Sequence, residues 1–143
     1  MLEAMSEKWN KFIQDKLLWN DLIDGVLLLT NNLEPVYTFG ELCDIPENQF
    51  HQFERIFQWD LLSEFDRNCV LANGFQLDVG LRTLKFVVRQ RQDHSAYAIT
   101  KANAMGLVVV NLPFGILVAS HSYPVTSAVA SQHVEDVCRV LRS

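Results

Sequence analysis

Apolar residues recur every three or four positions at both ends of the chain, which is the period of an amphipathic helix. Over residues 2–21 the apolar stripe consists of Met5, Trp9, Phe12, Ile13 and Leu17. Over residues 126–142 it consists of Ala130, Val134, Val137 and Leu141. Thr126 or Ser127 is the expected N-cap of this second segment. We therefore predict a helix at each end, with one face to bury against the rest of the fold.

The first half of the interior is predicted to form a hairpin and then a short helix. "IDGVLLLT" and "LEPVYTFG" are joined by "NN", a pair that suits a tight turn, which predicts a hairpin over residues 23–40. Pro46 is expected in the first turn of a helix over residues 46–58. Residues 59–74 follow neither period, and their last two, "NG", are a turn signal.

The second half of the interior is predicted to be a run of strands. In "LRTLKFVVRQR" Leu84, Phe86 and Val88 alternate with a basic set. That set, expected on the opposite face, is Lys85, Arg89 and Arg91. "SAYAITKA" predicts a further strand over residues 95–102. The connections are too short for crossover helices, so we expect an antiparallel sheet.

The stretch "GLVVVNLPFGILVASHS", residues 106–122, is almost free of charge and could be taken for a membrane span. A spanning helix needs about 20 continuous apolar residues, and this run is interrupted by Pro113 and Gly115. Two short runs of branched side chains instead favour strands buried on both faces. We predict a hairpin at the centre of the sheet and no membrane span.

Composition narrows the class of protein. The 143 residues fit a single domain, 1–143, and the net charge of −5 argues against nucleic-acid binding. Three scattered cysteines favour reduced thiols, and Glu3 and Glu7 stand where an export signal would be basic or apolar. A cytoplasmic protein is expected.

Candidate chemistry is sparse. The four histidines lack metal-ligand spacing, and neither a phosphate-binding glycine loop nor a nucleophile elbow is found. Cys138 and His133 lie five positions apart, so on one helix they point to different sides. We predict a protein that is not an enzyme, with no catalytic residue, no metal and no cofactor.

Taken together, the patterns resemble the profilin family. The opening "KWNKFIQDKL" is similar to the start of profilins, in which a Trp precedes an aromatic by three positions. "GFQLDVGLRTLKFVVRQ" is similar to a family segment that begins Gly-x-x-Leu and enters a strand, and the end of the chain from residue 99 also matches. The resemblance implies an α+β fold with an antiparallel sheet of six to seven strands. It places the two terminal helices together on one face and the inner helix on the other.

Profilins bind proline-rich segments through aromatic rings of the terminal helices and the first hairpin. The positions of this chain that match that site are Trp9, Phe12, Tyr37, Arg139 and Val140. Phe12 lacks the hydroxyl of the usual Tyr, and the last two positions carry no ring. The resemblance therefore implies weak or lost binding of proline-rich segments. Trp9 and Phe12 also suit a simpler role, packing of the first helix on the sheet.

Profilins also bind monomeric actin, which makes an actin monomer the expected partner and the actin cytoskeleton the expected location. The candidate actin-binding positions are Lys85, Arg89, Lys101, Ser127, Ser131, Val134 and Glu135, and Ala130 lies among them. Ser131 and Val134 stand where a Lys and an aromatic are common in the family. These departures keep a second hypothesis open, a scaffold or assembly subunit of the roadblock or longin kind with no actin function.

Overall fold

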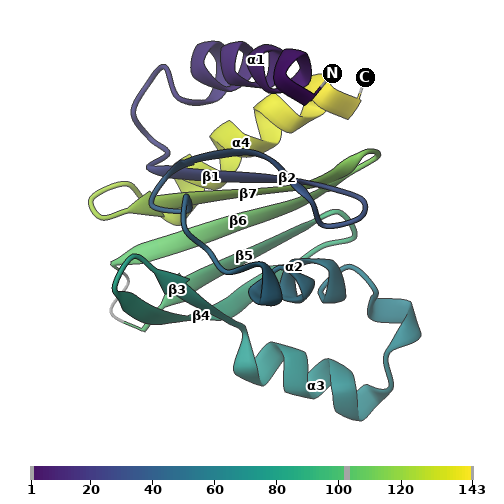
Figure 1. Cartoon of the computed structure of the whole chain (residues 1–143). Coiled ribbons are helices and arrows are strands. Elements are labelled where there is room, and N and C mark those ends of the chain that lie inside the picture. The colour runs from purple at the N-terminus through teal and green to yellow at the C-terminus, as the bar shows by residue number, and fades with distance from the viewer. Residues whose placement is uncertain (1, 102–103, 143) are drawn as a thin grey trace.

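The computed structural model describes residues 2–101 and 104–142, and it forms one seven-stranded sheet (Figure 1). The strand order is β2-β1-β7-β6-β5-β4-β3, and every neighbouring pair is antiparallel. The strands are β1 (Gly25–Thr30), β2 (Pro35–Gly40), β3 (Phe75–Val79), β4 (Arg82–Arg91), β5 (Ser95–Thr100), β6 (Met105–Leu112) and β7 (Gly115–Ser122). The predicted α+β class, antiparallel sheet and central β6–β7 hairpin are confirmed.

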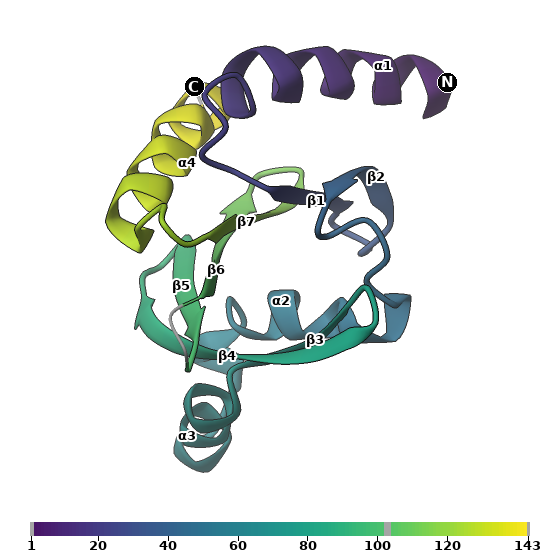
Figure 2. The ribbon, with the colours of Figure 1, turned by 90° about the vertical axis from the view of Figure 1, so that its left-hand side faces the viewer.

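The helices cover both faces of the sheet. They are α1 (Leu2–Phe12), η1 (Ile13–Leu17), η2 (Glu47–Gln49), α2 (His51–Arg55), η3 (Trp59–Leu61), α3 (Glu64–Asn73) and α4 (Ser127–Arg142). Figures 1 and 2 show α1 and α4 on one face and α2 on the other, with α3 beyond β4 at the margin of the molecule. The predicted placement of the terminal helices together on one face is confirmed.

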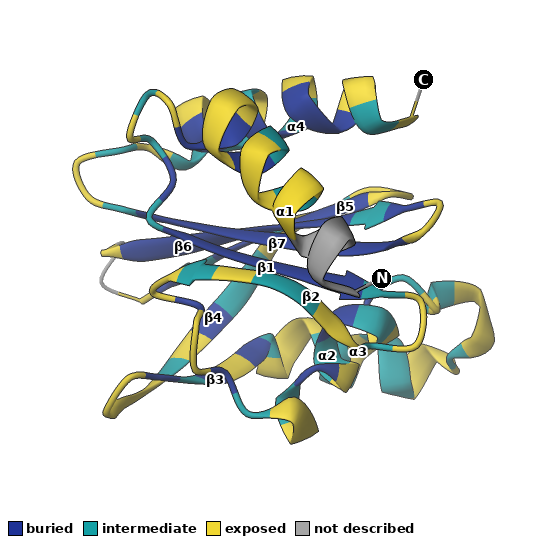
Figure 3. Ribbon diagram, turned by 45° about the horizontal axis from the view of Figure 1, so that its top comes forward, coloured by how far each residue is buried: buried dark blue, intermediate teal, exposed yellow. Residues whose placement is uncertain are grey.

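Each face of the sheet has its own core, which explains the long uncharged stretch of the sequence. In β6, Val108 and Val110 pack against η1 and α4, whereas Leu107 and Val109 pack on the α2 side. Because both faces of the central strands are covered, they need apolar side chains at every position. Figure 3 shows these strands as continuously buried.

The predicted helices differ from the observed ones at two places. The first helical segment ends in a π-turn at Leu17, before the predicted end at residue 21. The segment over 46–58 is broken into a 3₁₀ turn and the short α2, and Pro46 precedes them with an extended backbone (ψ 140°). Pro46 therefore stands before the helical residues and not in their first turn.

Helix α3 lies in the segment for which the sequence predicted no element. Ser63 caps it, accepting a hydrogen bond from the Asp66 backbone N–H (3.1 Å), and Gly74 ends it with φ 61°. The Asn73-Gly74 pair thus marks a helix end and not a hairpin turn. The hydrophobic pattern did not predict this helix, because Phe65 and Leu71 are exposed and its apolar residues form no buried stripe.

A bulge in β4 makes the observed arrangement of its basic residues differ from the predicted one. Val88 pairs with Ala98, but Gln90 pairs with Tyr97, so the alternation shifts at Arg89. Arg91 consequently turns to the α2 side, where its Nε donates to the Ile56 carbonyl (3.0 Å). The prediction that Arg91 shares a face with Lys85 was wrong, because one inserted residue reverses every side chain beyond it.

Two glutamine side chains occupy the outer edge of β3, the last strand of the sheet. The Gln52 amide accepts from the Gln76 backbone N–H (2.8 Å) and donates to the Gln76 carbonyl (2.9 Å). The Gln49 amide accepts from the Asp78 backbone N–H (2.9 Å) and donates to the Asp78 carboxylate (3.1 Å). These side chains take the place of a further strand and leave fewer edge groups for pairing with another chain.

Removing both amides, in the variant Gln49→Ala/Gln52→Ala, is expected to lower the free energy of unfolding by about 1–3 kcal/mol. The variant loses four hydrogen bonds, and its exposed edge should also raise aggregation at high concentration. Urea denaturation and light scattering measure the two effects. Gln58→Ala is the control, because Gln58 is exposed and its amide donates to Glu54 within the same segment. Equal stability of the double variant and the control would contradict the proposed role.

Candidate protein-binding site

A groove runs between the start of α4 and strands β4 and β5, and we call it the β5–α4 groove. It has a volume of about 530 Å³. Its lining residues are Arg89, Gln90, Tyr97, Ala98, Ile99, Ser127, Ala128 and Ser131. Three candidate residues from distant parts of the sequence, Arg89, Ser127 and Ser131, therefore share one hollow.

Local structure positions the polar side chains of this groove. The bulge lies at Arg89, an exposed residue near the end of β4. The hydroxyl of Thr126 accepts from the Val129 backbone N–H (3.3 Å) and caps α4, as the sequence predicted. The Ser131 hydroxyl donates to the Ala128 carbonyl (3.2 Å). Arg89 and the hydroxyl-bearing Ser127 and Ser131 therefore share the groove with the half-buried Ile99.

Glu135 fastens α4 to the sheet beneath the groove. Its Oε1 accepts from the Ser95 hydroxyl (2.5 Å) and the Tyr97 hydroxyl (3.0 Å), and Arg142 lies 3.9 Å from its other oxygen. Burial, together with the hydrogen bond to Glu135, raises the pKa of Tyr97 to about 12, so Tyr97 stays a neutral donor near pH 7. The Glu135 carboxylate is thus engaged by contacts within the protein, and these contacts hold α4 against β5.

The remaining candidates for actin binding lie outside this groove. Lys85 and Lys101 are exposed but do not line it. Val134 is fully buried in the core under α4, as is Ala130. Val134 is therefore corrected from a surface candidate to a core residue, since a side chain without exposed area offers no contact to a partner.

The aromatic candidates lie half-buried against the α4-side core. The ring of Trp9 lies 6.1 Å from that of Phe12 and 5.3 Å from that of Phe114, measured between centroids. Phe114, which stands in the turn between β6 and β7, was not among the candidates predicted from the sequence. A partly exposed aromatic ring in a two-residue turn contributes little to the core, and this position in the turn was the only feature of the sequence that could have marked Phe114 as a candidate. Tyr37 packs on the same core, and its hydroxyl accepts from Gln14 (3.5 Å).

The last two candidates for a proline-rich ligand lie near the end of α4. Arg139 is exposed and lies 3.4 Å from Asp136 of the same helix. Val140 is 61% exposed. Neither residue supplies an aromatic ring. The aromatic cluster on this side of the molecule consists of Trp9, Phe12 and Phe114.

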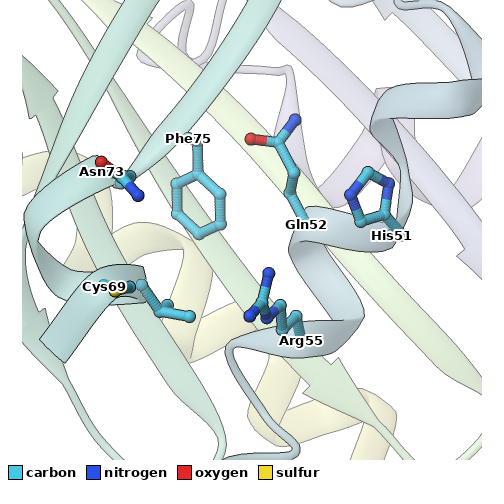
Figure 4. A pocket seen from close by; sticks show the side chains of 8 residues that line it. His51, Gln52, Arg55, Cys69, Asn73 and Phe75 are labelled. Carbon is cyan, nitrogen blue, oxygen red and sulfur yellow. The ribbon is translucent and has the colours of Figure 1, made fainter. Parts of the chain in front are cut away.

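A smaller pocket between α2, α3 and β3 contains a cysteine and a histidine. Figure 4 shows Cys69 and His51 on opposite sides of it, with Phe75 and Gln52 between them. His51 Nδ1 lies 2.9 Å from the carbonyl of Asn48, within its own segment. The described residues therefore do not assemble a cysteine–histidine pair in this pocket.

The other cysteine–histidine combination is not formed either. Cys138 is buried, and burial raises the pKa of its thiol to about 12, which disfavours the nucleophilic thiolate. His133 Nε2 donates to the Leu17 carbonyl (2.8 Å), which ties the π-turn to α4. Within residues 2–101 and 104–142, no cluster of potential metal ligands is found and no helix is long and apolar enough to cross a membrane.

A buried histidine, His121, lines a pocket with Ser127 at the start of α4 and is expected to make stability dependent on pH. Burial lowers the pKa of His121 below the ordinary 6.5, although Asp24 and a hydrogen bond with the Val125 backbone favour the protonated form. In acid the unfolded chain takes up a proton that the folded chain resists. We expect the free energy of unfolding to fall as pH drops below about 6.5.

Urea denaturation of two histidine variants at a series of pH values checks this expectation. His121→Gln should weaken the decline in acid, whereas His94→Gln should leave it unchanged because His94 is exposed. An identical pH dependence in His121→Gln and the parent chain would contradict the assignment.

Comparison with known proteins identifies the fold. No family model and no curated protein sequence matches the chain. Among solved structures, Schizosaccharomyces pombe profilin is similar with a TM-score of 0.74 and 16% identity, covering 93% of this chain and 95% of that one. Acanthamoeba castellanii profilin II gives a TM-score of 0.72 and 16% identity, covering 92% and 94%. LokiProfilin1, solved in complex with rabbit actin, gives 0.72 and 13%, covering 96% of both. The chain has the profilin fold.

Proposed function

We propose that this profilin-fold chain binds monomeric actin through the β5–α4 groove and regulates actin assembly in the cytoplasm. The observation that carries the proposal is the meeting of Arg89, Ser127 and Ser131 in one groove. The likeness to LokiProfilin1 and LokiProfilin2, both solved in complex with rabbit actin, supports the choice of partner.

The chemistry of the groove suits a protein surface with acidic groups. Arg89 is exposed and forms no ion pair among the described residues, so its guanidinium is available to a carboxylate. Ile99 and Ala128 contribute apolar surface to the groove, and a polar rim around an apolar centre is the usual composition of a protein interface. The exposed Lys85 and Lys101 add positive charge that attracts an acidic partner in a chain of net charge −5.

Assembly of pyrene-labelled actin tests the proposal directly. Saturating protein is expected to slow spontaneous assembly, because a bound monomer is withdrawn from nucleation. Co-sedimentation should leave the protein in the supernatant with unassembled actin. If assembly is unchanged both with and without a formin-like nucleator, the proposal fails.

We further propose that binding of proline-rich segments is weak or lost. Phe12 lacks a hydroxyl donor, and Trp9, Phe12 and Tyr37 are half-buried, which limits the ring faces open to a polyproline helix. Calorimetric titration with a proline-rich peptide, run beside the actin titration, is expected to give no saturable heat. Saturable binding of the peptide would contradict this part of the proposal.

A further inference from the structure

A second groove lies on the α2 and α3 side of the sheet, at the end of β4, and we call it the Trp59 groove. It has a volume of about 380 Å³. Its lining residues are Trp59, Leu71, Val88, Arg89, Gln90 and Arg91. Trp59, Leu71 and Val88 contribute its apolar surface, and the bulged end of β4 contributes polar groups and positive charge.

The guanidinium groups of two arginines are held near Trp59 by hydrogen bonds to backbone carbonyls. Arg67 Nε donates to the Trp59 carbonyl (2.8 Å), and Arg91 Nε donates to the Ile56 carbonyl (3.0 Å). Their guanidinium carbons lie 5.7 Å and 4.5 Å from the centre of the Trp59 ring. Neither arginine pairs with a carboxylate of the described residues. The terminal nitrogens of both therefore remain available to carboxylates of a partner, and their positions are already ordered.

The complementary surface lies on the same chain, in the segment "DLLSEFD" at residues 60–66. Leu61 is 81% exposed and Phe65 is 75% exposed, and the acidic Asp60 and Glu64 are exposed beside them. Helix α3, which begins in this segment, has no buried residue. Large exposed apolar side chains flanked by carboxylates suit a groove that combines apolar side chains with arginines.

We propose that two copies of this chain associate reciprocally, with segment 60–66 of each copy seated in the Trp59 groove of the other. Figures 1 and 2 both place α3 at the outer margin of the molecule, on the side opposite α1 and α4. Segment and groove thus lie at the same margin, where a two-fold axis brings both pairs together. This inference goes beyond actin binding. Arg89 lines both grooves, so the test uses residues that do not line the β5–α4 groove.

Sedimentation equilibrium of the full chain measures this association without actin. Between about 10 µM and about 1 mM, the weight-average mass is expected to rise from one copy toward two, since a small interface gives weak binding. One copy has a mass of 16.4 kDa. Dilution followed by ¹H–¹⁵N spectra should shift amides of residues 59–71 and 88–91 and leave the β5–α4 groove outside residues 88–91 unshifted.

Variants at exposed positions distinguish this interface from nonspecific association through exposed apolar side chains. Leu61→Ser/Phe65→Ser and Asp60→Lys/Glu64→Lys should each raise the dissociation constant by about tenfold or more, with the thermal midpoint near that of the parent. Leu81→Ser is the matched control, because Leu81 is 107% exposed in the turn between β3 and β4. A constant mass of one copy, an equal loss in Leu81→Ser, or shifts confined to another surface would overturn the proposal.

Discussion

The Arg89→Glu variant is expected to bind monomeric actin roughly thirtyfold more weakly than the parent chain, a loss of about 2 kcal/mol. Arg89 is the cation of the β5–α4 groove, and the β4 bulge presents it at the surface. Reversal replaces an attraction to acidic groups with a repulsion. Because Arg89 is exposed and forms no ion pair among the described residues, the fold should survive the change.

The matched control for this prediction is Arg55→Glu, which makes the same charge change on α2, on the opposite face of the sheet. Binding to fluorescently labelled monomeric actin should be unchanged in the control. Lys85→Glu, outside the groove but on β4, should reduce the association rate in a salt-dependent way with a smaller loss of affinity. Equal losses in Arg89→Glu and Arg55→Glu would show a general charge effect and exclude the groove as the binding site.

The largest loss of stability is expected from Gly115→Ala, at about 3 kcal/mol. Gly115 opens β7 and pairs with Thr30 of β1 and Leu112 of β6. A Cβ at this position would lie 1.9 Å from the carbonyl oxygen of Leu29. Since that oxygen belongs to the backbone of the neighbouring strand, the clash is relieved only if strands at the centre of the sheet move apart and lose hydrogen bonds.

Gly80→Ala separates this steric effect from the conformational preference of glycine. Gly80 has φ 61° in the turn between β3 and β4, and an added Cβ there meets no atom within 4 Å. Only the left-handed conformation is penalised, by about 1–2 kcal/mol. Urea denaturation followed by circular dichroism compares the two variants. A loss in Gly115→Ala no larger than that in Gly80→Ala would contradict the clash.

Elements with strong local signals were predicted close to their observed positions. The β6–β7 hairpin was found because Pro113 interrupts two apolar runs, and α4 because Thr126 precedes a regular apolar stripe. Helix α3 was missed because its apolar residues face solvent. A pattern search detects burial and not helicity itself, so a helix that covers little of the core leaves only its cap, Ser63, as a signal.

The candidate site was less accessible to prediction than the fold. Arg89 and Ser131 were named from the sequence, and the structure brings both into one groove. Val134 was named as a surface residue but lies in the core, since the resemblance supplied its role and the stripe of α4 buries it. Phe114 was not named, because a turn residue reveals its partner Trp9 only after the chain has folded.

By itself, the order of apolar and polar residues determined an antiparallel sheet that is preceded and followed in the sequence by a helix, because hydrophobic period and turn residues act over a few positions. Only the tertiary structure decided which side chains meet. A single bulge at Arg89 sends Arg91 to the far face, where it stacks on Trp59, and Glu135 joins Ser95 and Tyr97 beneath α4. Such contacts depend on strand register and helix packing. Both are determined by many small interactions across the whole core, so no short stretch of sequence predicts them.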